Sequence, residues 1–325
     1  MVNIGIVGSG FMAETHTNAY NSIDGANIVA VASPNTADEF IEEHQLEADS
    51  FRTADELLED ATVDVIDVCS PTPTHRPVVE TAAAAGIDVF CEKPVAGSLE
   101  DAQAIADAAA DADIAVMVGH VLRFFPQYAQ ARDVVEDGGI GNLGVARARR
   151  LSAFPDWGHG NWYADRDQSG GVLLDLAIHD LDFLRWVGGD VERVFARRTR
   201  WDEGEHGHVT LRFADGAVGY VEASWGLPAG QELTHSFELA GDDGLLEFDG
   251  EQPAMTTSTE QGTTHSSPLS AGGYQRQLEA FLESIQAGRE PPVTVEDGIE
   301  TLRLSVAANR SAAEGRPVAL EEVKA

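Results

Sequence analysis

Apolar segments alternate with helix-forming segments along the first 120 residues of the chain. The apolar segments are short and rich in β-branched residues, and they cover positions 2–8, 27–33, 63–70, 87–93 and 114–120. Strands that are buried on both faces have this composition. The segments between them are rich in Ala, Leu and Glu, as short helices are. The alternation predicts an α/β fold that begins with a doubly wound parallel sheet.

The hydrophobic pattern changes after residue 119. A helix is predicted over 126–136, and polar and apolar residues then alternate as in strands with one solvated face. These predicted strands cover positions 145–154, 191–200, 208–214, 217–225, 235–241 and 244–250. The polar residues 251–273 are expected to form a mobile surface loop before a helix that begins near Tyr274. We therefore predict two domains: residues 1–119, and an α+β domain over 120–325 with a mostly antiparallel, open sheet.

The loop after the first predicted strand has the pattern G-x-G-x-x-A, formed by Gly8, Gly10 and Ala13. The first glycine permits a tight turn, the second lets the backbone approach a pyrophosphate, and Ala13 lets the following helix pack closely. The plainer interpretation is an ordinary tight turn, but the position in a doubly wound domain favours a bound dinucleotide. The first domain is therefore predicted to be a Rossmann domain, with Gly8, Gly10, Phe11 and Met12 contacting the coenzyme.

The end of the second predicted strand bears on the choice of coenzyme. NAD enzymes commonly place Asp or Glu there, on the adenosine ribose. This chain has Ser33, Pro34, Asn35 and Thr36 instead, with Arg52 near the third strand. Because no carboxylate is present to repel a 2′-phosphate, the sequence favours NADP over NAD and leaves both open. Ser33 and Asn35 are predicted to contact the coenzyme.

The composition describes a strongly acidic protein that has almost no lysine. Among 325 residues, 55 Asp and Glu outweigh 21 Lys and Arg, which gives a net charge of −34. Self-repulsion of this size is screened by concentrated salt, so we predict a protein of the salt-rich cytoplasm of a halophile, with an acidic mesophilic protein as the alternative. Nucleic acid and anionic membranes are not expected as partners. Two cysteines, no basic leader and no apolar stretch of about 20 residues are consistent with a cytoplasmic location.

One of the only two lysines, Lys93, follows the fourth apolar segment in the sequence CEKPV. Parallel strands bring their carboxyl ends to one edge of the sheet, where ligands of this architecture bind. The side chains predicted at that edge to contact the coenzyme are Ser70, Pro71, His75, Glu92 and Lys93. The plainer alternative is that Lys93 forms a surface ion pair with Glu92.

The segment 170–189 is predicted to be a single, nearly all-apolar helix with glycines at both ends. Asp175, His179 and Asp182 lie at positions i, i+4 and i+7, which places them on one helical face. A polar stripe on such a helix is costly unless it faces a site. The alternative is a core histidine whose hydrogen-bonding capacity is satisfied by Asp175.

Together these motifs resemble the Gfo/Idh/MocA oxidoreductase family, named for glucose-fructose oxidoreductase and inositol dehydrogenase. The resemblance is carried by the glycine loop followed by His16, by CSPTPTH (69–75), by CEKP (91–94) and by GGVLLDLAIHDLD (170–182). It implies a catalytic set of Lys93, Asp175 and His179, a sugar, polyol or inositol substrate, and subunit contacts through the open sheet of a homodimer or homotetramer. The chain departs from the family pattern at Ala177, where glycine is frequent, and at Ser33, where an acidic residue is common.

The chemistry of these residues suits an NAD(P)-dependent dehydrogenase that acts on a secondary alcohol or hemiacetal. His179, neutral near pH 7, can take the hydroxyl proton while hydride leaves the carbon for nicotinamide. Asp175 is expected to set the tautomer of His179, and Lys93 to donate a hydrogen bond to the reacting oxygen. Two alternatives stay open: an NAD-dependent glycosidase of the same family, and a non-catalytic regulator that binds NADP and a sugar.

Several other residues are of types that bind polyols or metals. Besides His179, the predicted substrate residues are Arg123, Trp157, Trp162 and Tyr163, with His159 nearby; aromatic side chains stack on sugar rings but are as often simply packed. Asp156 with His159, or His206 with His208, could suggest a metal. Because no further ligand cluster has matching spacing, no metal site is predicted.

Overall fold

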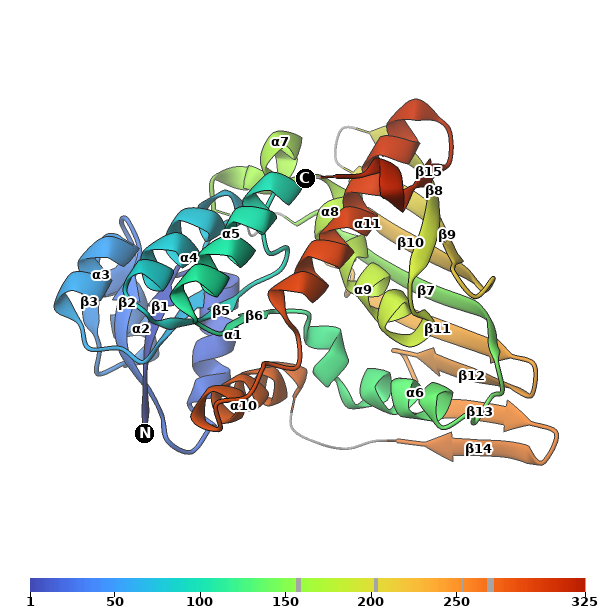
Figure 1. Ribbon diagram of the computed structural model, residues 1–325, viewed down its shortest axis with the longest axis horizontal. Helices are drawn as coiled ribbons and strands as arrows, with labels where there is room; N and C mark the ends of the chain where they lie inside the picture. Colours follow the sequence, from blue (N-terminus) through green and yellow to red (C-terminus); the bar gives the residue numbers. More distant parts are fainter. Residues whose placement is uncertain (156–158, 202–203, 253, 268–271, 325) are drawn as a thin grey trace.

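The computed structural model describes residues 1–155, 159–201, 204–252, 254–267 and 272–324 (Figure 1). For residues 159–161 and 167 it describes the backbone alone.

The first domain is built on a parallel sheet of six strands in the order β3-β2-β1-β4-β5-β6. The strands are β1 (Val2–Val7), β2 (Ala26–Ala32), β3 (Asp49–Phe51), β4 (Val65–Val68), β5 (Asp88–Cys91) and β6 (Val116–Val118). The helices between them are α1 (Phe11–Tyr20), α2 (Ala37–His44), α3 (Ala54–Asp60), η1 (Thr72–Thr74), α4 (His75–Ala84) and α5 (Leu99–Ala112). The predicted Rossmann architecture is confirmed. Only the three-residue edge strand β3 was not predicted.

The second domain contains a mixed sheet of nine strands in the order β14-β13-β12-β11-β7-β10-β9-β8-β15. The strands are β7 (Leu143–Ala153), β8 (Val191–Trp201), β9 (Gly204–Phe213), β10 (Val218–Leu227), β11 (Thr234–Gly241), β12 (Gly244–Asp249), β13 (Met255–Thr259), β14 (Gly262–Ser266) and β15 (Val318–Ala319). Strands β7 and β10 pair in parallel, and the other neighbours pair antiparallel. The prediction of a mostly antiparallel sheet is therefore confirmed.

The prediction of a loop over residues 251–273 is wrong for much of that segment. Strands β13 and β14 form a hairpin at the edge of the sheet. Its threonines are β-branched and suit extended backbone. The strands are polar on both faces, however, so no apolar alternation indicated them.

The helices of the second domain also reach the first. They are η2 (Val121–Phe124), α6 (Pro126–Glu136), η3 (His159–Ala164), α7 (Arg166–Ser169), α8 (Val172–Asp175), α9 (Ala177–Gly188), α10 (Gly273–Gln286), α11 (Val295–Glu314) and η4 (Leu320–Glu322). Helix α11 packs against β8 and α9 as well as against α5, and α10 packs against α1 (Figure 1). Phe281 of α10 meets Phe90 of β5, with ring centroids 5.7 Å apart. The two halves of the chain are thus joined by shared packing.

Helices α8, α9 and α11 lie on the same side of the nine-stranded sheet (Figure 1). The side chains that alternate away from them are polar or partly exposed: Arg147, Arg149, Phe195, Arg197, His206, His208, Thr210, Arg212, Tyr220 and Glu222. We call this surface the open face. No helix among the described residues has both the length and the apolar character needed to cross a bilayer.

Candidate active site

The glycine loop lies between β1 and α1. Gly8 has φ +117°, and a Cβ there would lie 2.7 Å from the carbonyl carbon of Cys69, so a side chain would be both strained and blocked. A Cβ on Gly10 would meet nothing within 4 Å. There is therefore open space at the amino end of α1, where Phe11 is exposed and Met12 is partly buried. Backbone N–H groups at such a helix end suit a pyrophosphate.

Three hydroxyl groups meet at the carboxyl end of β2. Ser9 Oγ lies 2.9 Å from Ser33 Oγ and 2.6 Å from Thr36 Oγ1, and Ser33 Oγ lies 2.9 Å from Thr36 Oγ1. Ser33 is buried, and Asn35 beside it is exposed. We call Ser9, Ser33 and Thr36 the hydroxyl cluster. It links the glycine loop to the turn that is predicted to hold the adenosine ribose.

The loop after β4 contains Ser70, Pro71 and His75, which were predicted to contact the coenzyme. Ser70 is partly buried and Pro71 is exposed at the sheet edge. His75 is buried, with Nδ1 at 3.0 Å from the carbonyl oxygen of Pro94 and Nε2 at 2.9 Å from that of Ser70. His75 therefore joins this loop to the Lys93 loop from inside the protein.

A buried chain of ionisable groups supports the backbone at Lys93. His16 of α1 lies with Nδ1 at 2.8 Å from Asp67 Oδ2 and Nε2 at 3.3 Å from Glu92 Oε1. The backbone N–H of Lys93 donates to Glu92 Oε2 at 3.0 Å. Burial opposes protonation of His16, but Asp67 and Cys69 outweigh it and hold its pKa well above the usual value. Protonated His16 thus holds Glu92 and, through Glu92, the position of Lys93.

This arrangement differs from the prediction for Glu92. Its side chain is only 5% exposed and is directed at His16, so it is not presented to a coenzyme. His16 and Asp67 were not among the predicted site residues. The available signal was Asp67 itself, an ionisable residue in the middle of an otherwise apolar, doubly buried strand.

Lys93 and Asp175 meet across the boundary between the two halves of the chain. Lys93 follows β5, next to a cis Lys93–Pro94 peptide, and Asp175 ends α8. Nζ of Lys93 lies 3.0 Å from Oδ1 of Asp175 and 3.0 Å from its carbonyl oxygen. The two side chains are 14% and 11% exposed, so the pair is largely shielded while one edge reaches solvent.

His179 lies in α9, one turn beyond Asp175. The predicted single helix over 170–189 is wrong, because the chain breaks at Leu176 between α8 and α9. The structure shows no hydrogen bond between the described side chains of Asp175 and His179; the carboxylate pairs with Lys93 instead. Burial, then the charges of Lys93 and Arg150, lower the pKa of His179 well below its usual value. A neutral, partly exposed imidazole therefore lies close to the Lys93–Asp175 pair.

Two further residues, His120 and Tyr163, lie near His179 and Asp175. His120, just after β6, is 1% exposed, and neither ring nitrogen has a hydrogen-bond partner among the described residues. It was not among the predicted site residues. Tyr163 is buried, and burial together with Asp175 and Glu92 raises the pKa of its hydroxyl, which keeps it protonated. The ring of Trp162 lies 4.2 Å from that of Tyr163. Trp157, Asp156 and the side chain of His159 lie outside the described residues.

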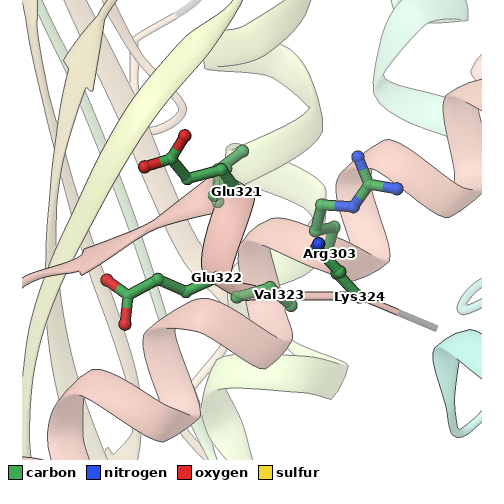
Figure 2. Close-up of a pocket in the computed structure, with 6 residues that line it drawn as sticks. Arg303, Glu321, Glu322, Val323 and Lys324 are labelled. Carbon is green, nitrogen blue, oxygen red and sulfur yellow. The ribbon is translucent and has the colours of Figure 1, made fainter.

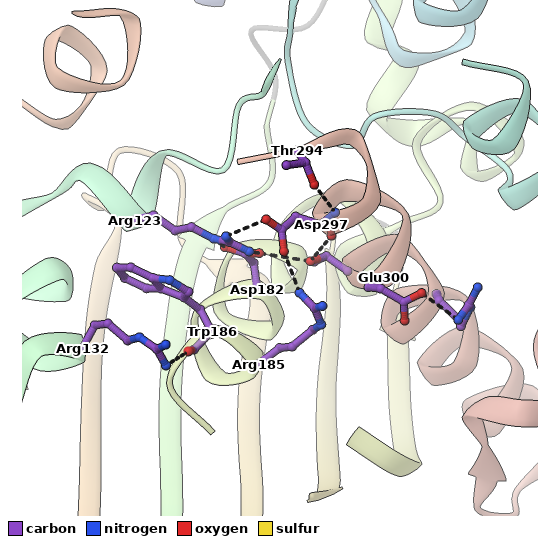
Figure 3. Close-up of polar contacts among 10 residues, drawn as sticks. Arg123, Arg132, Asp182, Arg185, Trp186, Thr294, Asp297 and Glu300 are labelled. Carbon is purple, nitrogen blue, oxygen red and sulfur yellow. Dashed lines mark hydrogen bonds and ion pairs between the residues drawn. The ribbon is translucent and has the colours of Figure 1, made fainter. Parts of the chain in front are cut away.

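Arg123 was predicted to bind substrate, but its guanidinium group is engaged by two carboxylates (Figure 3). Nε and Nη2 donate to the two oxygens of Asp182 at 2.9 and 2.7 Å, and Nη1 donates to Asp297 at 3.0 Å. Asp297 also accepts from Arg185 at 3.0 Å. Arg123 is 8% exposed, and its contacts make it a structural link between η2, α9 and α11. Asp182, which was predicted to share a helical face with His179, therefore pairs with Arg123.

His16, Asp67 and Cys69 also form a cluster of potential metal ligands. Burial and then Asp67 raise the pKa of the Cys69 thiol. The same three groups already satisfy one another by hydrogen bonding. We assign no metal to this cluster.

A hollow near the carboxyl end is lined by Arg303 and by Leu320, Glu321, Glu322, Val323 and Lys324 (Figure 2). None of these residues belongs to the predicted site, and Arg303 forms an ion pair with Glu300 at 2.7 Å. The hollow is therefore separate from the candidate active site.

Known proteins resemble this chain in both fold and sequence. Residues 2–120 match the model described as "Oxidoreductase family, NAD-binding Rossmann fold", and residues 132–320 match the "Oxidoreductase family, C-terminal alpha/beta domain". The myo-inositol 2-dehydrogenase of Thermotoga maritima is 31% identical, with 99% of each chain covered. The D-apiose dehydrogenase of Paraburkholderia graminis is 30% identical, covering 98% of this chain and 90% of its own.

Among solved structures, an oxidoreductase from Agrobacterium radiobacter in complex with NAD+, L-tartaric acid and magnesium has a TM-score of 0.89 to this chain. It is 25% identical, with 99% of each chain covered. The two family models together account for most of the sequence, and they divide it between a coenzyme half and a carboxyl-terminal half. The chain therefore belongs to the Gfo/Idh/MocA family of oxidoreductases.

Proposed function

We propose that the protein is an NAD(P)-dependent dehydrogenase that transfers hydride between nicotinamide and a secondary alcohol or hemiacetal carbon of a sugar, polyol or inositol. The observation that carries this proposal is the meeting of Lys93 and Asp175 at 3.0 Å, with neutral His179 close by, at the carboxyl edge of the coenzyme sheet. The dehydrogenase relatives support the substrate class.

In this proposal His179 removes the hydroxyl proton of the substrate. Lys93 donates a hydrogen bond to the same oxygen and stabilises the negative charge that develops there. Asp175 holds the ammonium group of Lys93 in place, a role different from the one first expected for it. A nicotinamide coenzyme, whose pyrophosphate the glycine loop at the amino end of α1 would hold, would supply the hydride acceptor.

The hydroxyl cluster supports NADP as the preferred coenzyme, with NAD as the alternative. Residues 33–36 contain no acidic side chain, and hydroxyl groups can donate hydrogen bonds to a 2′-phosphate. Against this, the oxidoreductase from Agrobacterium radiobacter holds NAD+. The activity assay must therefore compare NAD with NADP.

A panel of aldoses, ketoses and inositols, assayed with NAD and NADP separately in molar KCl, tests the proposed function. Absorbance of reduced nicotinamide should rise with at least one polyol. Release of an aglycone from a glycoside, without net reduction of tightly held NAD, would identify the glycosidase alternative instead. Binding of coenzyme and sugar with no turnover on any panel member would favour a regulator.

We expect the dehydrogenase to stay active below the pH at which an ordinary histidine becomes protonated. The proposed base works in its neutral form, and the lowered pKa of His179 preserves that form as the pH falls. The acid limb of the kcat/KM profile for alcohol oxidation is therefore expected below the usual value of 6.5. The profile should be measured at constant salt, and an acid limb at or above that value would contradict the assignment of His179.

The source and the assembly of the protein also belong to this proposal. The net charge of −34 supports a halophile with a salt-rich cytoplasm. The family resemblance, which implies subunit contacts through the open sheet, supports a homodimer or homotetramer formed through the open face, where Tyr220 is 45% accessible. Light scattering in molar salt would measure the size of the assembly.

A further inference from the structure

Two histidines and one glutamate converge on the open face. His206 and His208 are separated by one residue in β9, so their side chains point to the same side of the sheet. Glu222 of β10 lies directly opposite His208 in the antiparallel ladder between the two strands. Sequence spacing predicted no metal site because no third ligand was visible. The sheet register supplies that ligand from a different strand.

The distances among the three side chains would let them coordinate a single ion. Nε2 of His206 lies 3.9 Å from Oε1 of Glu222, and the two imidazole centroids are 4.9 Å apart. The potential ligand atoms of the three residues all lie within 4.8 Å of one another. Ligands about 2.0–2.2 Å from a tetrahedral ion are themselves about 3.4 Å apart. A contraction of at most about 1.4 Å is therefore enough, and the partly or fully exposed side chains can make it by χ rotations while the ladder fixes their backbones.

In the single chain, the neighbouring charges leave this position on the open face accessible to a cation; in an assembly formed through the open face, the same position would lie within the subunit contact. Arg149 Nε lies 3.4 Å from Oε2 of Glu222, which leaves Oε1 directed toward His206. Arg197, opposite His208 on β8, lies over the ring of Phe195 at 5.0 Å and donates to the carbonyl oxygen of Gly315. Its guanidinium group is thus held away from the two histidines. The overall charge of −34 raises the local concentration of divalent cations.

We propose that His206, His208 and Glu222 bind one divalent transition-metal ion, with Zn²⁺ as the preferred ion. Two imidazoles and a carboxylate form a set that Zn²⁺ accepts with a fourth position left open, whereas Mg²⁺ and Ca²⁺ prefer oxygen ligands. The ion ties β9 to β10 on the side of the sheet opposite α8 and α9. It is therefore separate from Lys93, Asp175 and His179, and hydride transfer does not require it.

Zinc titration of untagged, chelator-treated protein tests the site, with a chromophoric chelator as competitor and the melting temperature as a second readout. Wild type is expected to bind one Zn²⁺ per chain and to melt at higher temperature with Zn²⁺ but not with Mg²⁺. His206→Ala, His208→Ala and Glu222→Gln should each weaken binding by at least about tenfold. Each should retain wild-type turnover, because the residues lie away from the catalytic set.

His265→Ala is the matched control, since His265 is also an exposed histidine of the same sheet, on β14. It should leave both the zinc affinity and the zinc-dependent rise in melting temperature unchanged. The site does not exist if wild type fails to bind Zn²⁺, or if His206→Ala and His208→Ala bind it as tightly as His265→Ala. Loss of turnover on removal of zinc would also overturn the proposal, because it would place the metal in the active site. The zinc-binding and melting outcomes do not depend on whether the proposed substrate class is correct, whereas the turnover outcomes rest on the proposed function.

Discussion

Replacement of Lys93 by methionine is expected to lower kcat by about 100- to 1,000-fold, the usual effect of removing one hydrogen-bond donor to a developing oxyanion. Methionine keeps the length of the side chain but carries no charge and no donor. The ammonium group is held at 3.0 Å from Oδ1 of Asp175, so its loss also frees that carboxylate to move. Coenzyme affinity should change little, because the glycine loop and the hydroxyl cluster are untouched. Turnover is followed by nicotinamide absorbance and coenzyme binding by fluorescence titration.

The chain offers a matched control, because Lys324 is the only other lysine. Lys324→Met removes the same group from the carboxyl end and should leave kcat unchanged. Equal turnover in the Lys93 and Lys324 variants would refute the role proposed for Lys93. If Lys93→Met instead both bound coenzyme weakly and melted at a lower temperature, Lys93 would be needed to hold the two halves of the chain together.

Asp182→Asn is expected to lower the free energy of unfolding by about 3–5 kcal/mol, as breaking a buried ion pair does. Asp182 is fully buried, accepts two hydrogen bonds from Arg123 and accepts a third from Thr301 at 3.1 Å (Figure 3 shows the link to Arg123). The amide keeps the shape but leaves the Arg123 charge only partly compensated. Denaturant unfolding at fixed salt measures the effect. Glu300→Gln, which removes the partly exposed ion-pair partner of Arg303, should lower the free energy of unfolding by at most about 1 kcal/mol.

The same ion pair gives the stability a defined dependence on pH. Burial opposes ionisation of Asp182, but Arg123 outweighs it and lowers its pKa to about 2. The unfolded carboxyl group has a pKa of about 3.9. The stabilisation is therefore complete above that value and is lost as the pH falls toward 2. Asp182→Asn should lack this part of the acid dependence, and equal unfolding free energies of wild type and Asp182→Asn at neutral pH would contradict the assignment.

Much of the fold was predictable because burial on both faces imposes a composition on the strands. Apolar β-branched runs located five of the six Rossmann strands, while β3 contains only Asp49, Ser50 and Phe51 and is too short to show a pattern. The hairpin β13–β14 was not predicted for a different reason: its strands are long enough to show a pattern, but neither of its faces is uniformly apolar. The break at Leu176 was also hidden, because apolar residues continue through it without interruption.

In the candidate site, residue types were easier to predict than partners. The rarity of lysine indicated Lys93, and the ionisable residues of an apolar helix indicated Asp175 and His179. Spacing along a helix suggested that Asp175 pairs with His179, whereas its carboxylate meets the ammonium group that follows β5. Sequence spacing also gave no sign that Arg123 is taken by two carboxylates. Such pairings depend on how distant elements pack, which periodicity within one element does not encode.

Helix α10 completes the packing of the coenzyme half from the far end of the chain. Tyr274 and Phe281 of this helix face His16 and Phe90, in the layer beneath the glycine loop. A fragment ending near residue 119 would expose that layer to water and would leave His16 without the ring of Tyr274, although Phe90 would remain beside it. We therefore expect the coenzyme half to be less stable when it is expressed alone than within the full chain. During synthesis, we expect the interior beneath the glycine loop to be completed only after roughly the last fifty residues have emerged, because they include α10.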